Sequence, residues 1–144
     1  MKYVLALTTL LTAAAVFLVG AGGPPVTYIA HDKVGETLAK GGSLVTQADL
    51  TAQGSHRTAA GQVEVHDKET DVFYITDGEA TIVTGGTMVG GKSTKPGQWL
   101  GTSIEGGETH HLAKGDVMVI PAGVPHWFKE VPKEISYFVV KVLK

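Results

Sequence analysis

The sequence of 144 residues contains no cysteine, which excludes disulfides, thiolate metal sites, cysteine nucleophiles and lipid-modified cysteines. It also contains no asparagine, so no N-glycosylation site exists. Charge is scarce and balanced: 12 Lys and Arg against 14 Asp and Glu leave a net charge of −2, too little basic charge to predict binding to nucleic acid. Its 43% hydrophobic content and 19 glycines predict one globular, turn-rich domain. The groups left for chemistry are six histidines, carboxylates and hydroxyls.

The N-terminus has the pattern of a targeting segment. Met1 and Lys2 precede an apolar run over residues 3–21, and Gly-Gly-Pro-Pro ends it at residues 22–25. A positive start, an apolar middle and small residues before a cleavage point predict a signal peptide over residues 1–21 and an exported, periplasmic or secreted protein. The run is also long enough to span a bilayer. An uncleaved anchor, the one arrangement in which the chain would meet a membrane, therefore stays open.

The remaining chain changes its period once. Residues 32–40 predict one short helix, with Asp32 as its cap and Gly41-Gly42 as its stop. From Ser43 onward, short runs rich in Val, Ile, Thr, Tyr and Phe alternate with glycine-bearing turns, which predicts strands. No long helical segment separates them, so we expect an N-terminal segment over residues 22–42 and an all-β, antiparallel sandwich or barrel over residues 43–144.

Two glycine-rich features interrupt the strand pattern. Asp77-Gly78 predicts a tight hairpin turn between strands over residues 71–76 and 79–84, and residues 85–107 predict a long surface loop. Within that loop, residues 86–93 read GTMVGGKS and match a phosphate-binding pattern. Such a site needs a helix starting at its Lys-Ser pair, and Pro96-Gly97 would end that helix in its first turn. We therefore expect no nucleotide binding.

Four residues form the candidate site: Glu64, His66, Asp71 and His126. Glu64 and His66 are two apart on a strand and so share a face. Asp71 follows after a short turn, and His126 follows a Pro- and Gly-containing turn that restricts its backbone. Two imidazoles with one or two carboxylates suit a divalent metal with open coordination positions. An ordinary polar face with a buried structural histidine is the alternative reading of the same residues.

The segment over residues 115–130, GDVMVIPAGVPHWFKE, closely resembles the second signature motif of the cupin family. That motif is a glycine, five residues, Pro-x-Gly, two residues and a metal-binding His, then usually Asn after three more. Gly115, Pro121, Gly123 and His126 match it, and Glu130 stands in place of the Asn. The resemblance implies a cupin-type antiparallel β-barrel, also called a double-stranded β-helix or jelly roll, with one short N-terminal helix.

Residues 62–78 resemble the first cupin motif, in which His-x-His precedes a Glu and then a Gly. His66 matches the second His, Asp71 the Glu and Gly78 the closing glycine, whereas Glu64 stands in place of the first His. The resemblance thus implies one metal ion bound by Glu64, His66, Asp71 and His126. This set of two imidazoles and two carboxylates favours Fe²⁺, Mn²⁺ or Zn²⁺, with Ni²⁺ possible. If Glu64 does not bind the metal, it is a candidate catalytic base beside it.

Other residues support weaker predictions. Arg57, with His56, could meet an anionic substrate or lie in a solvated loop. Tyr74 and Trp127 are candidate walls of a substrate pocket, or core residues. Of His110 and His111, which are adjacent on a strand, at most one can face the interior.

The resemblance to cupins implies a range of activities on a small organic molecule: dioxygenation, isomerisation, decarboxylation or lyase chemistry. The two-His-one-carboxylate set favours an oxidoreductase, because it suits non-haem Fe²⁺. The alternative is a non-catalytic module that binds a small molecule or a metal. The resemblance also implies a homodimer paired through edge strands.

Overall fold

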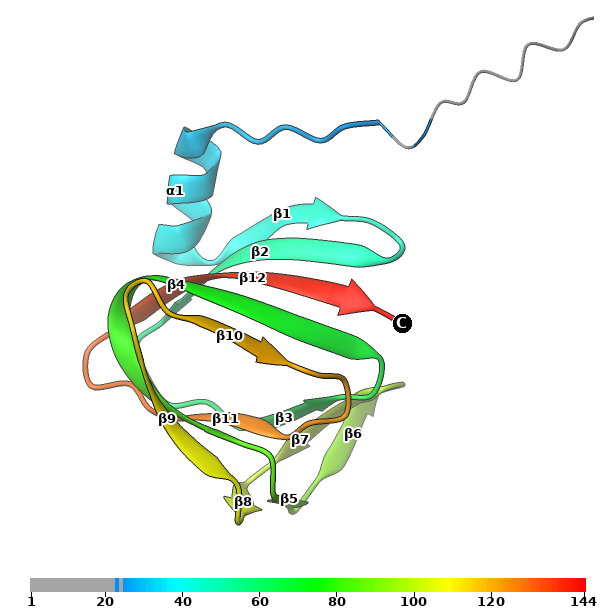
Figure 1. Cartoon of the computed structure of the whole chain (residues 1–144), viewed down its shortest axis with the longest axis vertical. Coiled ribbons are helices and arrows are strands. Elements are labelled where there is room, and N and C mark those ends of the chain that lie inside the picture. The colour runs from blue at the N-terminus through cyan, green and yellow to red at the C-terminus, as the bar shows by residue number, and fades with distance from the viewer. Residues whose placement is uncertain (1–22, 24) are drawn as a thin grey trace, which may run out of the picture.

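The computed structural model describes residues 23 and 25–144, so the predicted signal peptide over residues 1–21 lies outside the described residues. The fold is mostly β, a curled antiparallel sheet of the cupin half-barrel kind with one short helix (Figure 1). None of the helices in the described part of the chain has the length and apolar character needed to cross a membrane.

The elements follow the predicted order of one helix and then strands. Their bounds are α1 His31–Lys40, β1 Gly42–Thr46, β2 Leu50–Arg57, β3 Val63–His66, β4 Glu69–Thr84, β5 Thr87–Val89, β6 Lys92–Lys95, β7 Gln98–Gly101, β8 Ser103–Glu105, β9 Glu108–Ala113, β10 Val117–Ile120, β11 His126–Glu130 and β12 Ile135–Leu143.

Helix α1 packs on the outside of β1 and β2. The prediction of Asp32 as its cap is wrong: Ala30 occupies the cap position without a side-chain hydrogen bond, and Asp32 lies in the first turn. A carboxylate there still favours the helix, because it faces the positive end of the helix dipole. The helix ends as predicted at Gly41, which adopts φ +75° and donates its N–H to the carbonyl of Thr37.

Strand β4 joins the two layers of the fold (Figure 1). Its first half pairs with β10 and β12, and its second half pairs with β9 and β11, so the chain passes from one layer to the other within a single strand. The predicted hairpin at Asp77-Gly78 is therefore wrong. Gly78 has φ +75°, but a one-residue bulge at Thr76 and this glycine bend the strand instead of reversing it.

The predicted surface loop over residues 85–107 is also wrong, because it contains four short strands. β6 and β7 extend the main sheet beside β3, and β5 pairs with β8. Lys92 and Ser93, the end of the phosphate-binding pattern, begin β6 and not a helix. The many glycines made this segment resemble a loop in the sequence. In the structure they provide the positive φ angles of the tight turns between the strands.

The hydrophobic core lies between the two layers. Its side chains come from alternating positions of β4 and β12 and from the strands that pair with β4. The buried members are Phe73, Ile75, Ala80, Ile82, Leu112, Ile120, Phe128, Ile135, Tyr137 and Val139. The same inward alternation continues to polar side chains at one end of β4 and β12, where Asp71 and Lys141 lie across from each other in the strand pair.

Candidate metal centre

Three elements bring the site residues together. Glu64 and His66 share the inner face of β3, and His126 at the start of β11 pairs directly with Glu64 across the two strands. Asp71 occupies an inward position near the start of β4. Directly paired residues of adjacent strands hold their side chains about 5 Å apart. The antiparallel pairing of β11 with β3 therefore brings together residues that are some sixty positions apart in the chain.

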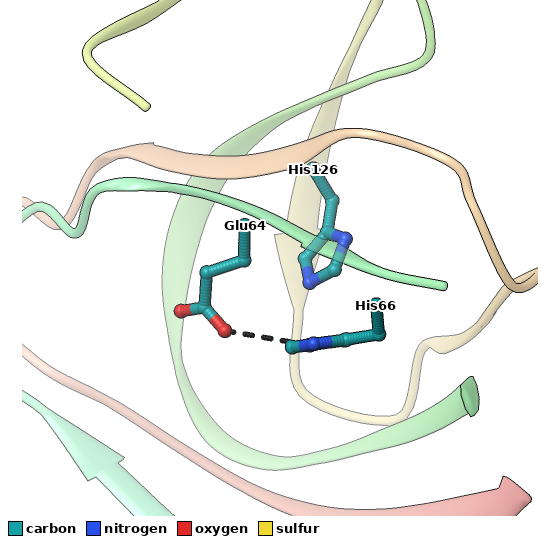
Figure 2. A group of neighbouring side chains, drawn as sticks. All are labelled: Glu64, His66 and His126. Atoms are coloured by element: carbon teal, nitrogen blue, oxygen red, sulfur yellow. Dashed lines mark ion pairs between the residues drawn. The ribbon is translucent and has the colours of Figure 1, made fainter. Parts of the chain in front are cut away.

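The candidate metal-binding atoms lie close together (Figure 2). Those of Glu64, His66 and His126 lie within 4.8 Å of one another, and His66 Nε2 is 3.5 Å from Glu64 Oε2. Asp71 Oδ2 lies 3.6 Å from His66 Nε2 and 3.7 Å from His126 Nε2. Asp71, His66 and His126 are buried, and Glu64 is half-buried.

The second nitrogen of each imidazole ring is held by a neighbour. His126 Nδ1 lies 3.1 Å from the carbonyl oxygen of Val124, and His66 Nδ1 contacts the side-chain oxygen of Gln98. Donation from Nδ1 leaves Nε2 as the unprotonated nitrogen that faces the cluster. Among the described residues, His66 Nε2 is buried without any hydrogen-bond partner.

This geometry fits a metal ion. Two donors that bond the same ion at about 2.1 Å with a tetrahedral angle lie about 3.4 Å apart. The observed separations of 3.5 to 3.7 Å are close to that value. A buried nitrogen without a partner is costly unless a ligand satisfies it, so the cluster could hold a metal ion through its imidazole and carboxylate groups.

Each carboxylate of the cluster has a cation beside it. Arg57, the chain's single arginine, donates to Glu64 Oε1 at 3.2 Å and to the Tyr137 hydroxyl at 2.8 Å. Lys141 Nζ donates to Asp71 Oδ1 at 2.8 Å and to Oδ2 at 2.9 Å. These pairs balance the buried negative charge within the site.

The pKa values follow from burial and these neighbours. Burial opposes ionisation of Glu64, but the close contact of its Oε2 with His66 and the positive charges of His126, Arg57 and His66 outweigh it and lower its pKa to about 2. Burial also opposes protonation of His66, yet the close contact with the Glu64 carboxylate and the charge of Asp71 leave its pKa raised. Burial dominates at His126 and lowers its pKa.

A cavity of about 80 Å³ opens beside the cluster. Its polar wall includes Glu64, Asp71 and His126 together with the two cations, and its apolar wall includes Phe73 and Phe128. A second, wider cavity of about 380 Å³ shares Arg57 and Tyr137 with it and reaches the surface. The inner volume is smaller than the roughly 150 Å³ that holds a benzene molecule, so it accommodates a small molecule or one end of a longer one.

The fold and the two motifs agree with those of a known protein family. The sequence model of the cupin family matches residues 29–142, which is most of the chain. This chain is a cupin. No curated protein matches it in sequence.

Solved structures share the fold at low sequence identity. BH2720 from Bacillus halodurans is 12% identical with a TM-score of 0.60, and the match covers 83% of each chain. The cupin domain of Cnp3 from Schizosaccharomyces pombe is 14% identical with a TM-score of 0.54, over 72% of this chain and 64% of that one. DMSP lyase DddQ from Ruegeria pomeroyi is 18% identical with a TM-score of 0.51, over 71% of this cupin and 45% of that chain. This cupin therefore spans less than half of the length of DddQ.

The structure shows which of the residues predicted to contact a substrate line the cavity. Arg57 lies on β2 and lines the cavity, so the solvated-loop reading is wrong. Tyr74 is 49% exposed on the outer face of β4, and Trp127 points away from His126 and donates to the carbonyl of Gly61; neither lines the cavity beside the cluster. The reason is strand alternation, since each directly follows a residue that faces inward.

His110 and His111 lie on β9, away from the cluster. His110 is half-buried and lies 3.3 Å from the hydroxyl of Thr84, and His111 is exposed. They provide useful control positions because they are histidines of the same chain outside the site.

Sequence reasoning missed Lys141, Tyr137, Gln98 and Glu69. Tyr137 and Lys141 occupy the same inward alternation of β12 as Ile135 and Val139, so a lysine at an interior position of an apolar strand could have been recognised in the sequence. Gln98 and Glu69 carried no such signal. Gln98 donates to Glu69 at 2.8 Å and contacts His66, a connection that depends on the pairing of β7 with β3.

Proposed function

We propose that this cupin binds one divalent metal ion, Fe²⁺, Mn²⁺ or Zn²⁺ with Ni²⁺ possible, and uses it to transform a small organic molecule. The observation that carries the proposal is the buried Nε2 of His66, which has no hydrogen-bond partner in the described part of the chain and lies close to His126 and Glu64, two residues that line the cavity. Closed structural metal sites favour thiolates, whereas imidazole and carboxylate sites with open positions are typical of catalysis.

The residues around the cavity have separable roles. A bound metal would supply Lewis-acid polarisation or an O₂ site. Arg57 and Tyr137 offer N–H and O–H groups that can orient oxygen atoms of a substrate, and the rings of Phe73 and Phe128 exclude water. Two imidazoles with one carboxylate suit non-haem Fe²⁺, so we favour an oxidoreductase over an isomerase, decarboxylase or lyase.

Metal content tests the proposal. Protein purified without an affinity tag is analysed by elemental mass spectrometry beside a His66→Ala/His126→Ala variant and a matched His110→Ala/His111→Ala control. We expect about one equivalent of metal in the wild type and control and none in the site variant. Absence of metal from all three, even after reconstitution with Fe²⁺, Mn²⁺, Zn²⁺ and Ni²⁺, would overturn it.

A non-catalytic binding module is the second candidate. The inner cavity is small, which suits capture of a metal or small ligand without turnover. The two candidates differ in one measurement. An enzyme converts a substrate and loses that activity in the folded His126→Ala variant, whereas a module shows saturable stabilisation by a ligand and forms no product.

Two further proposals concern the protein's location and assembly. We propose export to the periplasm or medium, supported by the signal-peptide pattern of residues 1–21. N-terminal sequencing of the protein recovered from the periplasm and from the medium tests this proposal.

We also propose a homodimer. Strand β10 is paired only with β4 within the described residues, and its Val117 and Val119 are 63% and 58% exposed. An unpaired edge with apolar side chains is suited to pairing with a second copy.

A further inference from the structure

The two carboxylates beside the imidazoles are held in different ways. Glu64 accepts a hydrogen bond from Arg57 on Oε1 only, and its Oε2 lies 3.5 Å from His66 Nε2. Asp71 has both oxygens bound by the ammonium of Lys141, at 2.8 and 2.9 Å. One carboxylate therefore keeps an oxygen directed at the imidazoles without a cation on it, and the other does not.

The Asp71–Lys141 pair is buried on the aspartate side, where the Asp71 side chain is 3% exposed and that of Lys141 is 18% exposed. On its other side, Lys141 Nζ lies 3.4 Å from Glu69 Oε2, and Glu69 is itself fixed by Gln98. The ammonium is thus held between two carboxylates and cannot withdraw from Asp71 without leaving a buried charge partly unpaired. Removing one partner of a buried pair is strongly unfavourable.

A metal ion that bound Asp71 would have to compete with this ammonium. Either Lys141 leaves, at the cost of that unpaired charge, or it stays and places a positive charge beside a divalent cation. The cost is smaller at Glu64, because Arg57 approaches the oxygen that is not directed at His66 and need not leave when the other oxygen binds an ion. The two carboxylates at ligand positions of the first cupin motif therefore do not have equal access to the metal.

We propose that Lys141 keeps Asp71 out of the metal's coordination shell, so that Glu64, His66 and His126 bind the ion. This inference rests on the proposed metal-binding function and reverses the assignment expected from the motif, in which Asp71 matches the usual carboxylate ligand. Asp71 instead supports the site from outside through its ion pair. The set becomes two imidazoles and one carboxylate, which leaves the remaining positions for water or substrate.

Charge-matched variants test this assignment through metal affinity. Asp71→Asn/Lys141→Met and Glu64→Gln/Arg57→Met each remove one negative and one positive charge, so the net charge of the site is unchanged. Metal-free protein is titrated with Co²⁺ by calorimetry, and the visible absorption of bound Co²⁺ reports its coordination. Thermal unfolding confirms that each variant is folded.

We expect Asp71→Asn/Lys141→Met to keep the wild-type Co²⁺ spectrum and to change affinity by no more than about tenfold, the lower end of the effect of losing a group outside the coordination shell. Glu64→Gln/Arg57→Met should lose more than about a hundredfold, beyond that range. The reverse ranking would overturn the inference while leaving metal binding established. Failure of the wild type to bind Co²⁺ would overturn both the inference and the proposed function.

Two single variants keep the test decisive if a double variant does not fold. Lys141→Met frees the Asp71 carboxylate, so Co²⁺ should bind at least about tenfold more tightly and its absorption should change as a new oxygen ligand enters. Lys141→Arg keeps the ion pair and should retain the wild-type affinity and spectrum. Unchanged or weaker binding in Lys141→Met would contradict the proposed role of Lys141.

Discussion

Glu64 should make metal-free protein most stable in mildly acidic solution, and Glu64→Gln should remove this effect. The folded protein lowers the pKa of Glu64 from 4.5 to about 2. A difference of this size corresponds to about 3 kcal/mol of folding free energy. The side chain is 30% exposed, and solvent screening reduces the contribution to about 2 kcal/mol.

The sign of the pH dependence follows from the two partners. A lowered carboxylate pKa contributes stability above the unfolded value, and this stability is lost as the pH falls from about 5 towards 2. The pKa of His66 is raised, so its contribution is present below its unfolded value of about 6.5 and is lost as the pH rises through the folded value. The stability difference between wild type and Glu64→Gln should therefore be largest near pH 5.

Urea unfolding of chelator-treated protein between pH 3 and pH 8 measures this difference. About 2 kcal/mol corresponds to a midpoint lower by about 1 M urea in Glu64→Gln at pH 5, with a smaller gap at both ends of the range. Glu79→Gln is a suitable control, because that glutamate is exposed on β4 outside the cluster. A gap between wild type and Glu64→Gln that does not vary with pH would refute the assigned ionic coupling between Glu64 and His66.

Three other outcomes are expected. Gly78→Ala should destabilise the protein by more than about 3 kcal/mol in thermal unfolding, because a Cβ there would overlap the carbonyl of Glu134 and φ is +75°. The control Gly85→Ala, where φ is +74° but the space around the Cβ is free, should cost about 1 kcal/mol. Equal losses in the two variants would contradict the overlap. Metal affinity should fall as the pH drops through the raised pKa of His66, since protons compete for Nε2; calorimetry showing no such fall would exclude His66 as a ligand. Val119→Lys should prevent assembly of the proposed homodimer in sedimentation, and a dimer that persists in the variant would exclude β10 as its interface.

The sequence was most informative where local patterns coincide with structure. Alternating β-branched and aromatic residues located most of the strands, and the spacing around Pro121 and Gly123 predicted the turn before His126. It was least informative in glycine-rich regions. Gly78 has the positive φ that the sequence predicted, but a glycine with this φ can either bend a continuous strand or reverse the direction of the chain. Only the pairing of both halves of β4 with other strands shows which one occurs.

The site divides in the same way. The local sequence pattern was enough to predict that Glu64 and His66 share a strand face and that His126 follows a restricted turn, because strand period and backbone restriction are local properties. The tertiary structure decided which cations face the carboxylates. Lys141 and Asp71 are seventy residues apart in the chain and form an ion pair in the fold. Whether the lysine side chain meets solvent or a buried partner depends on the strand that lies next to β12. Such pairings depend on the register of strands distant in the chain, which no local pattern encodes.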